Sequence, residues 1–415
     1  MATIKTLRCT ISGRDFTPDA ALYFNKDIGQ VATLDVLYDY EALRQQLDRD
    51  ALAASRDMSM WRYLPLLPLA EDATLPPLRV GLTPLYDAPR IAEYLGVRSV
   101  QVKDDGLNPT ASLKDRASAM VLARALEMGV NTVSTASTGN AAAALSGIGA
   151  SLPDMRIVIF VPATAPEAKI AQLLVYGATV LLVEDTYDTA FDLCYELCMS
   201  EGWYCRNTGI NPYTTEGKKT VAYEIAEQNN WDVPDVVVVS VGDGSIIGGV
   251  HKGFWELYQL GWIERIPRLI GVQSEGSAPL VKAWQQGVAP QDMQPIEVNT
   301  VADSIAAGLP RDRVKAMRAV KDTGGAFISV SDDEIVQAIP RLAQLSGVFA
   351  EPAAAASFAG AYRAVQSKLI GADERVTLLI TGNGLKDVKR AREGVGSGIY
   401  VPPDLDSIRR ELKKL

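Results

Sequence analysis

The stretch Asn108-Pro-Thr-Ala-Ser-Leu-Lys-Asp-Arg116 sets the expected fold and chemistry of this chain. Its Asn-Pro pair predicts a turn, because the residue before a proline avoids helical dihedral angles. Ser112 is expected to cap a helix that starts at Lys114 and ends before Gly129. A lysine at a helix start lies near the positive end of the helix dipole, which favours the neutral amine that Schiff-base chemistry requires. Without further signals, a solvated surface lysine is the commoner interpretation.

Two further stretches support the chemical interpretation of the lysine. Ser134-Thr-Ala-Ser-Thr-Gly-Asn140 opens an alanine-rich helix and combines hydroxyls, an amide and free N–H groups, which suits a carboxylate. The apolar run 236–241 leads into Gly242-Asp-Gly-Ser245 and then a helix, an arrangement that holds a phosphate on backbone amides. A glycine-rich turn alone is a weak signal. Lysine, carboxylate cradle and phosphate cradle together indicate a pyridoxal phosphate enzyme that handles an amino acid.

The amino-acid sequences of four segments resemble those of fold type II pyridoxal phosphate enzymes (the tryptophan synthase β-like superfamily), and most closely those of the threonine synthase family. The lysine motif 108–116 and the loop Ala136-Ser-Thr-Gly-Asn140 come first. Asn211-Pro-Tyr-Thr-Thr-Glu-Gly-Lys-Lys-Thr220 resembles the family's central segment, and Thr381-Gly-Asn-Gly-Leu-Lys-Asp387 its C-terminal signature. The resemblance extends over roughly residues 61–388.

The resemblance implies a role for each matching residue. Lys114 would be the catalytic lysine and would bind the cofactor, pyridoxal 5'-phosphate, as a Schiff base. Asn140 would bond the cofactor's ring hydroxyl, and Thr381 would face its ring nitrogen. The cofactor phosphate would be held by Gly242, Asp243, Gly244, Ser245 and Ile246. The substrate would be held by Ser137, Thr138 and Gly139 at its carboxylate, with Lys103, Asn207 and Thr214 as further contacts. The loop 301–309 and Glu351 are also expected near the cofactor.

The implied reaction converts O-phospho-L-homoserine and water to L-threonine and phosphate. One departure weakens this assignment: Thr214 stands where the family usually has an arginine, and a hydroxyl binds phosphate less strongly than a guanidinium does. Lys218 or Lys219 can compensate. The alternative is β-replacement or β-elimination on serine, O-phosphoserine, O-acetylserine or threonine, as in a cysteate or cysteine synthase or an ammonia-lyase. A third reading, a binding protein without catalysis, conflicts with the intact Lys114 motif.

Composition narrows the class of protein. The chain has 415 residues, 47% hydrophobic and 22% charged, which is ordinary for a globular protein. A net charge of −9 with dispersed basic residues argues against nucleic acid as a partner. No apolar run approaches the ~20 residues of a membrane helix, and the N-terminus does not resemble a signal peptide, so a cytoplasmic location is expected. A small-molecule substrate is the expected partner, and a homodimer is left open.

Metal binding is not expected from residue spacing. The four cysteines include no Cys-x-x-Cys pair, and the one histidine, His251, is expected to be a partly exposed helical residue. Cys194 and Cys198 lie one helical turn apart, which indicates core packing.

Three parts are expected in this α/β chain. Residues 1–62 form an N-terminal extension that resembles a degenerate zinc ribbon, in which only Cys9 remains of four ligand positions and zinc binding is therefore lost. Residues 63–130 and 208–415 form a large cofactor-binding lobe, and residues 131–207 a small mobile lobe. Each lobe is expected to hold an open, mostly parallel, twisted sheet with helices on both faces. The expected strands are 99–103, 156–161, 179–183, 203–206, 236–240, 268–273, 326–329 and 376–381. The expected helices are 40–54, 114–128, 141–150, 166–176, 186–201, 216–230, 246–260, 311–322, 331–347 and 353–368.

Overall fold

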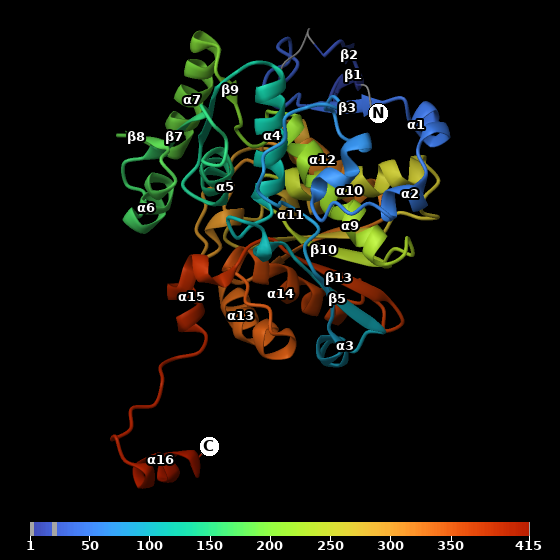
Figure 1. Ribbon diagram of the computed structural model, residues 1–415. Coiled ribbons are helices and arrows are strands. Elements are labelled where there is room, and N and C mark those ends of the chain that lie inside the picture. Colours follow the sequence, from blue (N-terminus) through green and yellow to red (C-terminus); the bar gives the residue numbers. More distant parts are fainter. Residues whose placement is uncertain (1–3, 19–22, 415) are drawn as a thin grey trace.

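A computed structural model of the chain describes residues 4–18 and 23–414 and contains three sheets (Figure 1). Residues 1–3 and 19–22 of the expected N-terminal extension lie outside the described residues. The first sheet is antiparallel, with β1 (Ile4–Cys9) between β2 (Asp15–Phe16) and β3 (Leu34–Tyr38).

The largest sheet has six strands in the order β12-β11-β10-β13-β5-β4, and all neighbours are parallel except the edge strand β4. The strands are β4 (Leu85–Asp87), β5 (Ser99–Asp104), β10 (Val236–Ser240), β11 (Arg268–Ser274), β12 (Ala326–Val330) and β13 (Arg375–Ile380). Five of these were expected within one or two residues, and the short strand β4 was not placed.

Both faces of this sheet are buried. Along β10, Val236 and Val238 join one hydrophobic cluster, whereas Val237 and Val239 join the other. A strand buried on both faces reads as a continuous β-branched run, which is the pattern that predicted β10. The helices of one face are α3 (Pro89–Leu95), α13 (Asp332–Ser346) and α14 (Pro352–Gln366). Those of the other face are α9 (Thr220–Gln228), α10 (Ser245–Gln259), α11 (Pro279–Gln286) and α12 (Arg313–Asp322).

The third sheet has four parallel strands in the order β8-β7-β6-β9. These strands are β6 (Thr132–Ala136), β7 (Arg156–Pro162), β8 (Thr179–Val183) and β9 (Tyr204–Cys205). The helices that accompany it are α5 (Asn140–Gly149), α6 (Glu167–Val175) and α7 (Tyr187–Glu201). Helix α4 (Lys114–Glu127) packs against α5 and connects the two larger sheets (Figure 1).

The start of α4 differs from the expectation in its cap. Ser112 does not cap the helix: its hydroxyl is buried and has no hydrogen-bond partner among the described residues. The preceding turn is instead held by Asp115, whose carboxylate accepts the N–H of Thr110 at 2.6 Å. The Leu113 N–H donates to Thr381 O at 2.9 Å. This bond fixes the position of Lys114, the first residue of α4, relative to the end of β13.

Two expected helices are interrupted. The segment expected as one helix over 216–230 forms α8 (Tyr213–Lys218) and α9, and the segment 40–54 forms α1 (Tyr40–Gln46) and α2 (Arg49–Ala53), with Asp48 capping α2. Gly217 lies within α8, and a Cβ there would lie 2.1 Å from Arg116 O. Helix α8 therefore lies against the backbone of α4 at a point where only glycine fits.

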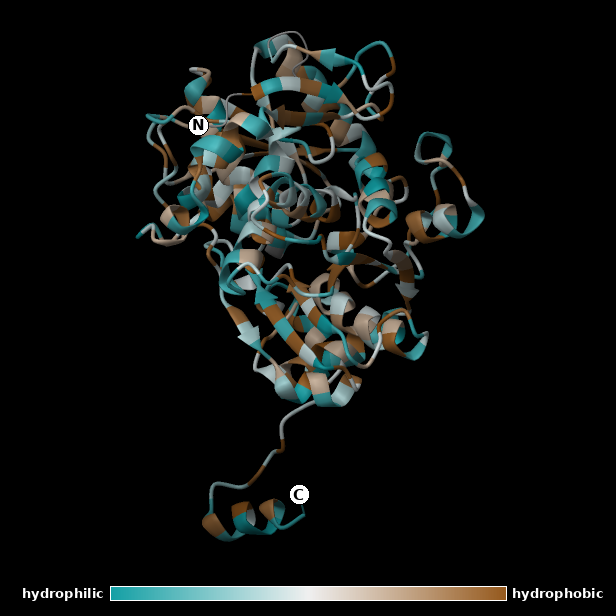
Figure 2. Ribbon diagram, turned by 90° about the vertical axis from the view of Figure 1, so that its right-hand side faces the viewer, coloured by the Kyte–Doolittle hydropathy of each residue, from teal (hydrophilic) through white to brown (hydrophobic). Residues whose placement is uncertain are grey.

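The C-terminal segment leaves the body of the molecule. Helix α15 (Val388–Glu393) still contacts α13, whereas α16 (Leu405–Leu412) stands apart and carries both hydrophobic and hydrophilic residues (Figures 1 and 2). Within the described ranges, none of the helices has the length and apolar character needed to cross a membrane.

Candidate active site

A cavity of about 1360 Å³ lies where the carboxyl ends of β6 and β10 meet the N-termini of three helices. Lys114 begins α4, Asn140 begins α5 and Ser245 begins α10, and all three residues line the cavity. Ligands of open α/β sheets bind in this position, outside the carboxyl ends of the strands. The three motifs that the sequence singled out are thus brought together by the fold.

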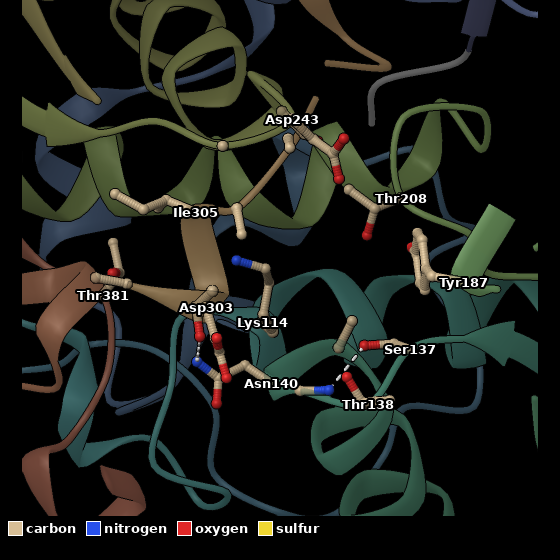
Figure 3. A pocket seen from close by; sticks show the side chains of 18 of the residues that line it. Lys114, Ser137, Thr138, Asn140, Tyr187, Thr208, Asp243, Asp303, Ile305 and Thr381 are labelled. Carbon is tan, nitrogen blue, oxygen red and sulfur yellow. Dashed lines mark hydrogen bonds between the residues drawn. The ribbon is translucent and has the colours of Figure 1, made fainter. Parts of the chain in front are cut away.

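Lys114 points into the middle of the cavity, between Thr381 on one side and Ser137 and Thr138 on the other (Figure 3). Burial lowers the pKa of Lys114 to about 8; nearby Arg206 acts in the same direction and the Glu351 carboxylate opposes it. An amine with this pKa is in part neutral near neutral pH, so it can act as a nucleophile and as a proton acceptor.

The loop 137–139 and Asn140 form one wall. The Gly139 N–H donates to Ser137 Oγ at 3.1 Å, which shapes the loop before α5. Asn140 Nδ2 donates to Glu351 Oε1 at 2.8 Å (Figure 3 shows the Asn140 side chain beside Lys114). Burial raises the pKa of Glu351, and the charges of Lys386 and Lys114 partly reverse this rise. Asn140 is therefore held in place by a buried carboxyl group.

The glycine-rich turn 242–246 forms the opposite wall. Gly244 has φ +89°, and a Cβ there would lie 2.7 Å from Ala316 Cβ, so both its conformation and its packing require glycine. Among the described residues no side chain caps α10, which leaves its first N–H groups free for an anion. The Asp243 carboxylate has a partner within the protein, since its Oδ1 accepts the Arg311 N–H at 3.2 Å.

Two buried basic side chains stand next to this wall, and the carboxylates of Asp243, Asp312 and Asp115 offset only part of the lowering of their pKa values. Lys218 lines the cavity and donates to Ser245 Oγ, whereas Arg206 lies behind Thr208 and donates to its hydroxyl at 2.7 Å. In the part of the chain that the structure describes, neither forms an ion pair, and Arg206 Nη2 has no hydrogen-bond partner. Burial lowers the pKa of Lys218, and the charges of Arg206 and Lys114 lower it further. A buried cation without a partner is costly, so this arrangement suits an anionic ligand.

Three residues expected to contact a substrate do not line the cavity. Lys103 is fully buried and donates to Glu224 Oε2 at 2.6 Å. Asn207 supports the substrate loop from behind, since its Oδ1 accepts the Ala136 N–H at 2.7 Å. Thr214 is buried and its hydroxyl donates to Asn211 O at 2.8 Å. The structure therefore places all three in supporting positions rather than at the cavity.

Several cavity residues were not expected from the sequence. Tyr187, Lys169, Arg311 and Lys386 line the cavity, as do Gln30 and Val31 of the N-terminal segment. Of these, only Lys386 lay inside a quoted motif, 381–387; the others come from loops or distant elements without a local signal. Of the two lysines proposed to compensate for Thr214, Lys218 reaches the cavity, whereas Lys219 pairs with Glu216 at 2.6 Å.

The expected core packing of Cys194 and Cys198 is confirmed, whereas the expected exposure of His251 is wrong. Cys194, Cys198 and Cys205 are all buried, and their sulfur atoms lie within 4.8 Å of one another. Spacing along the chain missed this group because Cys205 lies on β9 and the other two on α7. His251 is buried rather than partly exposed.

Comparison with known proteins identifies the class. A family model described as "Pyridoxal-phosphate dependent enzyme" matches residues 77–382, and the chain belongs to this family. Its curated relatives include a threonine synthase of Methanosarcina acetivorans, 38% identical over 407 residues that cover 98% of each chain. Another is a threonine synthase of Methanocaldococcus jannaschii, 36% identical over 409 residues, which cover 98% of this chain and 99% of the relative.

Solved structures agree on the fold. Isoform 2 of threonine deaminase from Solanum lycopersicum has a TM-score of 0.65 at 23% identity, over 85% of this chain and 90% of that one. Maize serine racemase has a TM-score of 0.62 at 20% identity, over 80% and 92%. The chain is thus an α/β protein of fold type II that depends on pyridoxal phosphate.

The residues present fit the cofactor. Lys114 offers an amine of lowered pKa, and the uncapped N-terminus of α10 offers N–H groups for a phosphate. The Ser240 hydroxyl lines the same cavity, is buried and has no hydrogen-bond partner within the described residues. The cavity exceeds the usual ~300–1,000 Å³ of a small-molecule site, which leaves room for a substrate beside the cofactor.

Proposed function

We propose that this enzyme is a threonine synthase that converts O-phospho-L-homoserine and water to L-threonine and phosphate. The observation that carries the proposal is the pair of buried basic side chains beside the cavity, Lys218 and Arg206, neither of which forms an ion pair among the described residues. Together with the N-terminus of α10 they make this wall attractive to phosphate, both that of the cofactor and that of the substrate. The relatives of the same length that are named threonine synthases support this choice.

Each wall of the cavity has a part in this reaction. The cofactor, when bound, supplies an electron sink that acidifies the protons next to the substrate's amino-bearing carbon. Lys114 would bind the cofactor and then carry protons, because its lowered pKa suits both uptake and release. Ser137, Thr138 and Gly139 would hold the substrate carboxylate at the start of α5. Lys218, backed by Arg206, would hold the phosphate and stabilise it as it leaves.

The cofactor would be held by the residues expected for it. Gly242, Asp243, Gly244, Ser245 and Ile246 surround the phosphate position with backbone N–H groups, Asn140 would reach the ring hydroxyl and Thr381 the ring nitrogen. A neutral hydroxyl at the ring nitrogen does not keep the ring protonated as a carboxylate does, which suits elimination and replacement better than amino-group transfer.

The second candidate is β-replacement or β-elimination on a three-carbon substrate or on threonine, and Thr214 favours it because no arginine stands at that position. A substrate panel separates the two. The purified enzyme is given O-phosphohomoserine, O-phosphoserine, O-acetylserine, serine and threonine, and phosphate, threonine, pyruvate and oxobutanoate are measured. Threonine and phosphate from phosphohomoserine alone support the proposal. Turnover of serine or its esters without activity on phosphohomoserine would reject it.

The role of Lys218 has its own test. Lys218→Met removes one charge-assisted contact worth about 1.5–3 kcal/mol, so kcat/KM for phosphohomoserine is expected to fall roughly 10- to 150-fold. Lys282→Met, at an exposed position of α11, is the matched control. The visible absorbance of the bound cofactor is titrated in both variants. If Lys218→Met weakens cofactor binding and leaves kcat/KM unchanged at saturating cofactor, Lys218 serves the cofactor phosphate and not the substrate.

We also infer that the N-terminal sheet is a zinc ribbon that has lost its metal. Cys9 Sγ accepts the Ser12 N–H at 3.3 Å and Asn25 Nδ2 at 3.6 Å, so an asparagine amide bridges the two turns where further thiolates would stand. For the lobes, we propose the division into 63–130 with 208–415, and 131–207, which the separate six-stranded and four-stranded sheets support. A cytoplasmic location and a homodimer stay predictions.

A further inference from the structure

Three of the four cysteines form a compact group away from the cavity wall. Cys194 and Cys198 lie one turn apart on α7, and Cys205 lies on β9, which pairs with β6. Their sulfur atoms are within 4.8 Å of one another, and all three side chains are inaccessible to solvent. The fourth, Cys9, is buried separately in the N-terminal sheet.

The group belongs to the hydrophobic core, but two polar side chains contact one of its sulfur atoms. The Ser134 hydroxyl lies 3.3 Å from Cys194 Sγ, and Asn207 Oδ1 lies 3.7 Å from the same sulfur.

We propose that Cys194, Cys198 and Cys205 form a three-sulfur site for a soft metal ion, and that Cu(I) is the ion the site fits. The site is additional to the proposed reaction and does not depend on it. Binding would form up to three metal–sulfur bonds and release the displaced thiol protons to solvent. No change of oxidation state is involved.

The geometry needs only a small adjustment. With metal–sulfur bonds of about 2.3 Å, three sulfurs around one ion in a plane are ~4.0 Å apart. The present separations reach at most 4.8 Å, so each sulfur has to move by less than 1 Å. Rotation about χ1 of a cysteine accomplishes such a shift without moving the backbone.

The ligand set separates Cu(I) from zinc. Structural zinc requires four strong ligands, most often thiolates and imidazoles. The only histidine, His251, lies on α10, outside this sheet, and the polar atoms in contact with Cys194 Sγ are the neutral oxygens of Ser134 and Asn207. A set of three sulfurs without a fourth strong ligand suits an ion that accepts three soft ligands, which is the preference of Cu(I).

The test is a competition titration of the reduced cofactor-loaded enzyme under anaerobic conditions. Cu(I) is presented as its complex with a chromogenic chelator, and loss of the chelator's colour measures transfer to the protein. One equivalent is expected to transfer to the wild-type enzyme. Cys198→Ser and Cys205→Ser are each expected to lower the Cu(I) affinity at least tenfold. Cys9→Ser is the matched control, because it removes a buried cysteine outside the group, and it is expected to bind Cu(I) as the wild type does.

Folding of each variant is checked by the visible absorbance of the bound cofactor, so a loss of Cu(I) binding in a cofactor-loaded variant is due to the missing sulfur. X-ray absorption of the loaded wild type is expected to give three sulfur neighbours. Unchanged affinity in Cys198→Ser and Cys205→Ser, an equal loss in Cys9→Ser, two sulfur neighbours, or displacement of Cu(I) by equimolar Zn²⁺ would each overturn the proposal.

Discussion

Lys103→Met tests whether a lysine at the end of a strand serves the substrate or the fold. Lys103 Nζ donates to Glu224 Oε2 at 2.6 Å, to Thr83 O at 2.7 Å and to Gln228 Oε1 at 2.8 Å. These bonds use all three protons of the ammonium group, so none remains for a ligand. The structure thus predicts a loss of stability and no direct loss of substrate binding.

The size of the loss follows from the charges around Glu224. This carboxylate also pairs with Arg116, which in turn pairs with Asp105 at 2.7 Å, and all four side chains are fully buried. Two cations and two carboxylates balance, and methionine in place of Lys103 leaves one negative charge uncompensated. Removing one partner of a buried pair costs about 3–5 kcal/mol. Because Arg116 still holds Glu224, we expect the lower end of this range, about 3 kcal/mol.

Urea unfolding followed by circular dichroism measures the stability. Steady-state kinetics, at urea concentrations low enough for the variant to stay folded, measure KM for the substrate. Lys103→Met is expected to unfold at clearly lower urea with KM within twofold of the wild type. The double variant Lys103→Met/Glu224→Gln restores the charge balance and is expected to cost less than the sum of the two single changes. A KM raised tenfold or more at unchanged unfolding midpoint would show that the substrate does reach Lys103 and would refute the structural assignment.

Two further predictions concern stability. Burial, with Arg318 next in size, lowers the pKa of His251 to about 4, below the value near 6.5 of an unfolded chain, so the unfolded state takes up the proton first as pH falls. The resulting loss of stability accumulates between about pH 6.5 and 4 and reaches about 3 kcal/mol. In His251→Gln, the free energy of unfolding should therefore depend less on pH in this range than it does in the wild type. The same pH dependence in both proteins would contradict the assignment. In the capping box of α13, Ser331 Oγ accepts the Glu334 N–H at 3.2 Å and the Glu334 carboxylate accepts the Ser331 N–H. Ser331→Ala is expected to lower the free energy of unfolding by about 1 kcal/mol, whereas Ser367→Ala, near the end of α14, serves as the control; equal effects would contradict the cap.

Local sequence was sufficient to predict those helices and strands whose own residues form a characteristic pattern. The first four residues of the run that became β10 are valines, and Gly129 follows α4 with φ +68°, so both were predicted closely. The close approach of α8 to α4 was not, because it depends on Gly217 meeting the backbone of Arg116, about 100 residues away. A close approach between distant segments leaves no periodic pattern in either of them.

The candidate site also has some features that local sequence predicts and others that depend on contacts with distant segments. Lys114, Asn140 and the turn after β10 each stand at a helix start, a position that sequence can indicate, and the structure brings all three to one cavity. Lys103 and Thr214 were assigned by their places in motifs, yet their partners are contributed by other elements and turn them away from the cavity. Sequence located the elements that bear the site but not which way each polar side chain faces.

Arg116 and Arg206 show why the three-dimensional structure was needed to tell a structural arginine from a ligand-binding one. Both arginines are fully buried; Arg116 ends the lysine motif 108–116, and Arg206 ends the expected strand 203–206. Arg116 meets Asp105 and Glu224, and a guanidinium with its charge balanced in this way holds elements together. Within the described residues, Arg206 donates to the hydroxyls of Ser118 and Thr208 and to no carboxylate, and its Nη2 has no partner. A protein bears the cost of such an unbalanced charge where a ligand supplies the missing anion. A structural arginine and a ligand-binding arginine therefore differ in their counter-charge. Residue type and burial do not reveal that counter-charge.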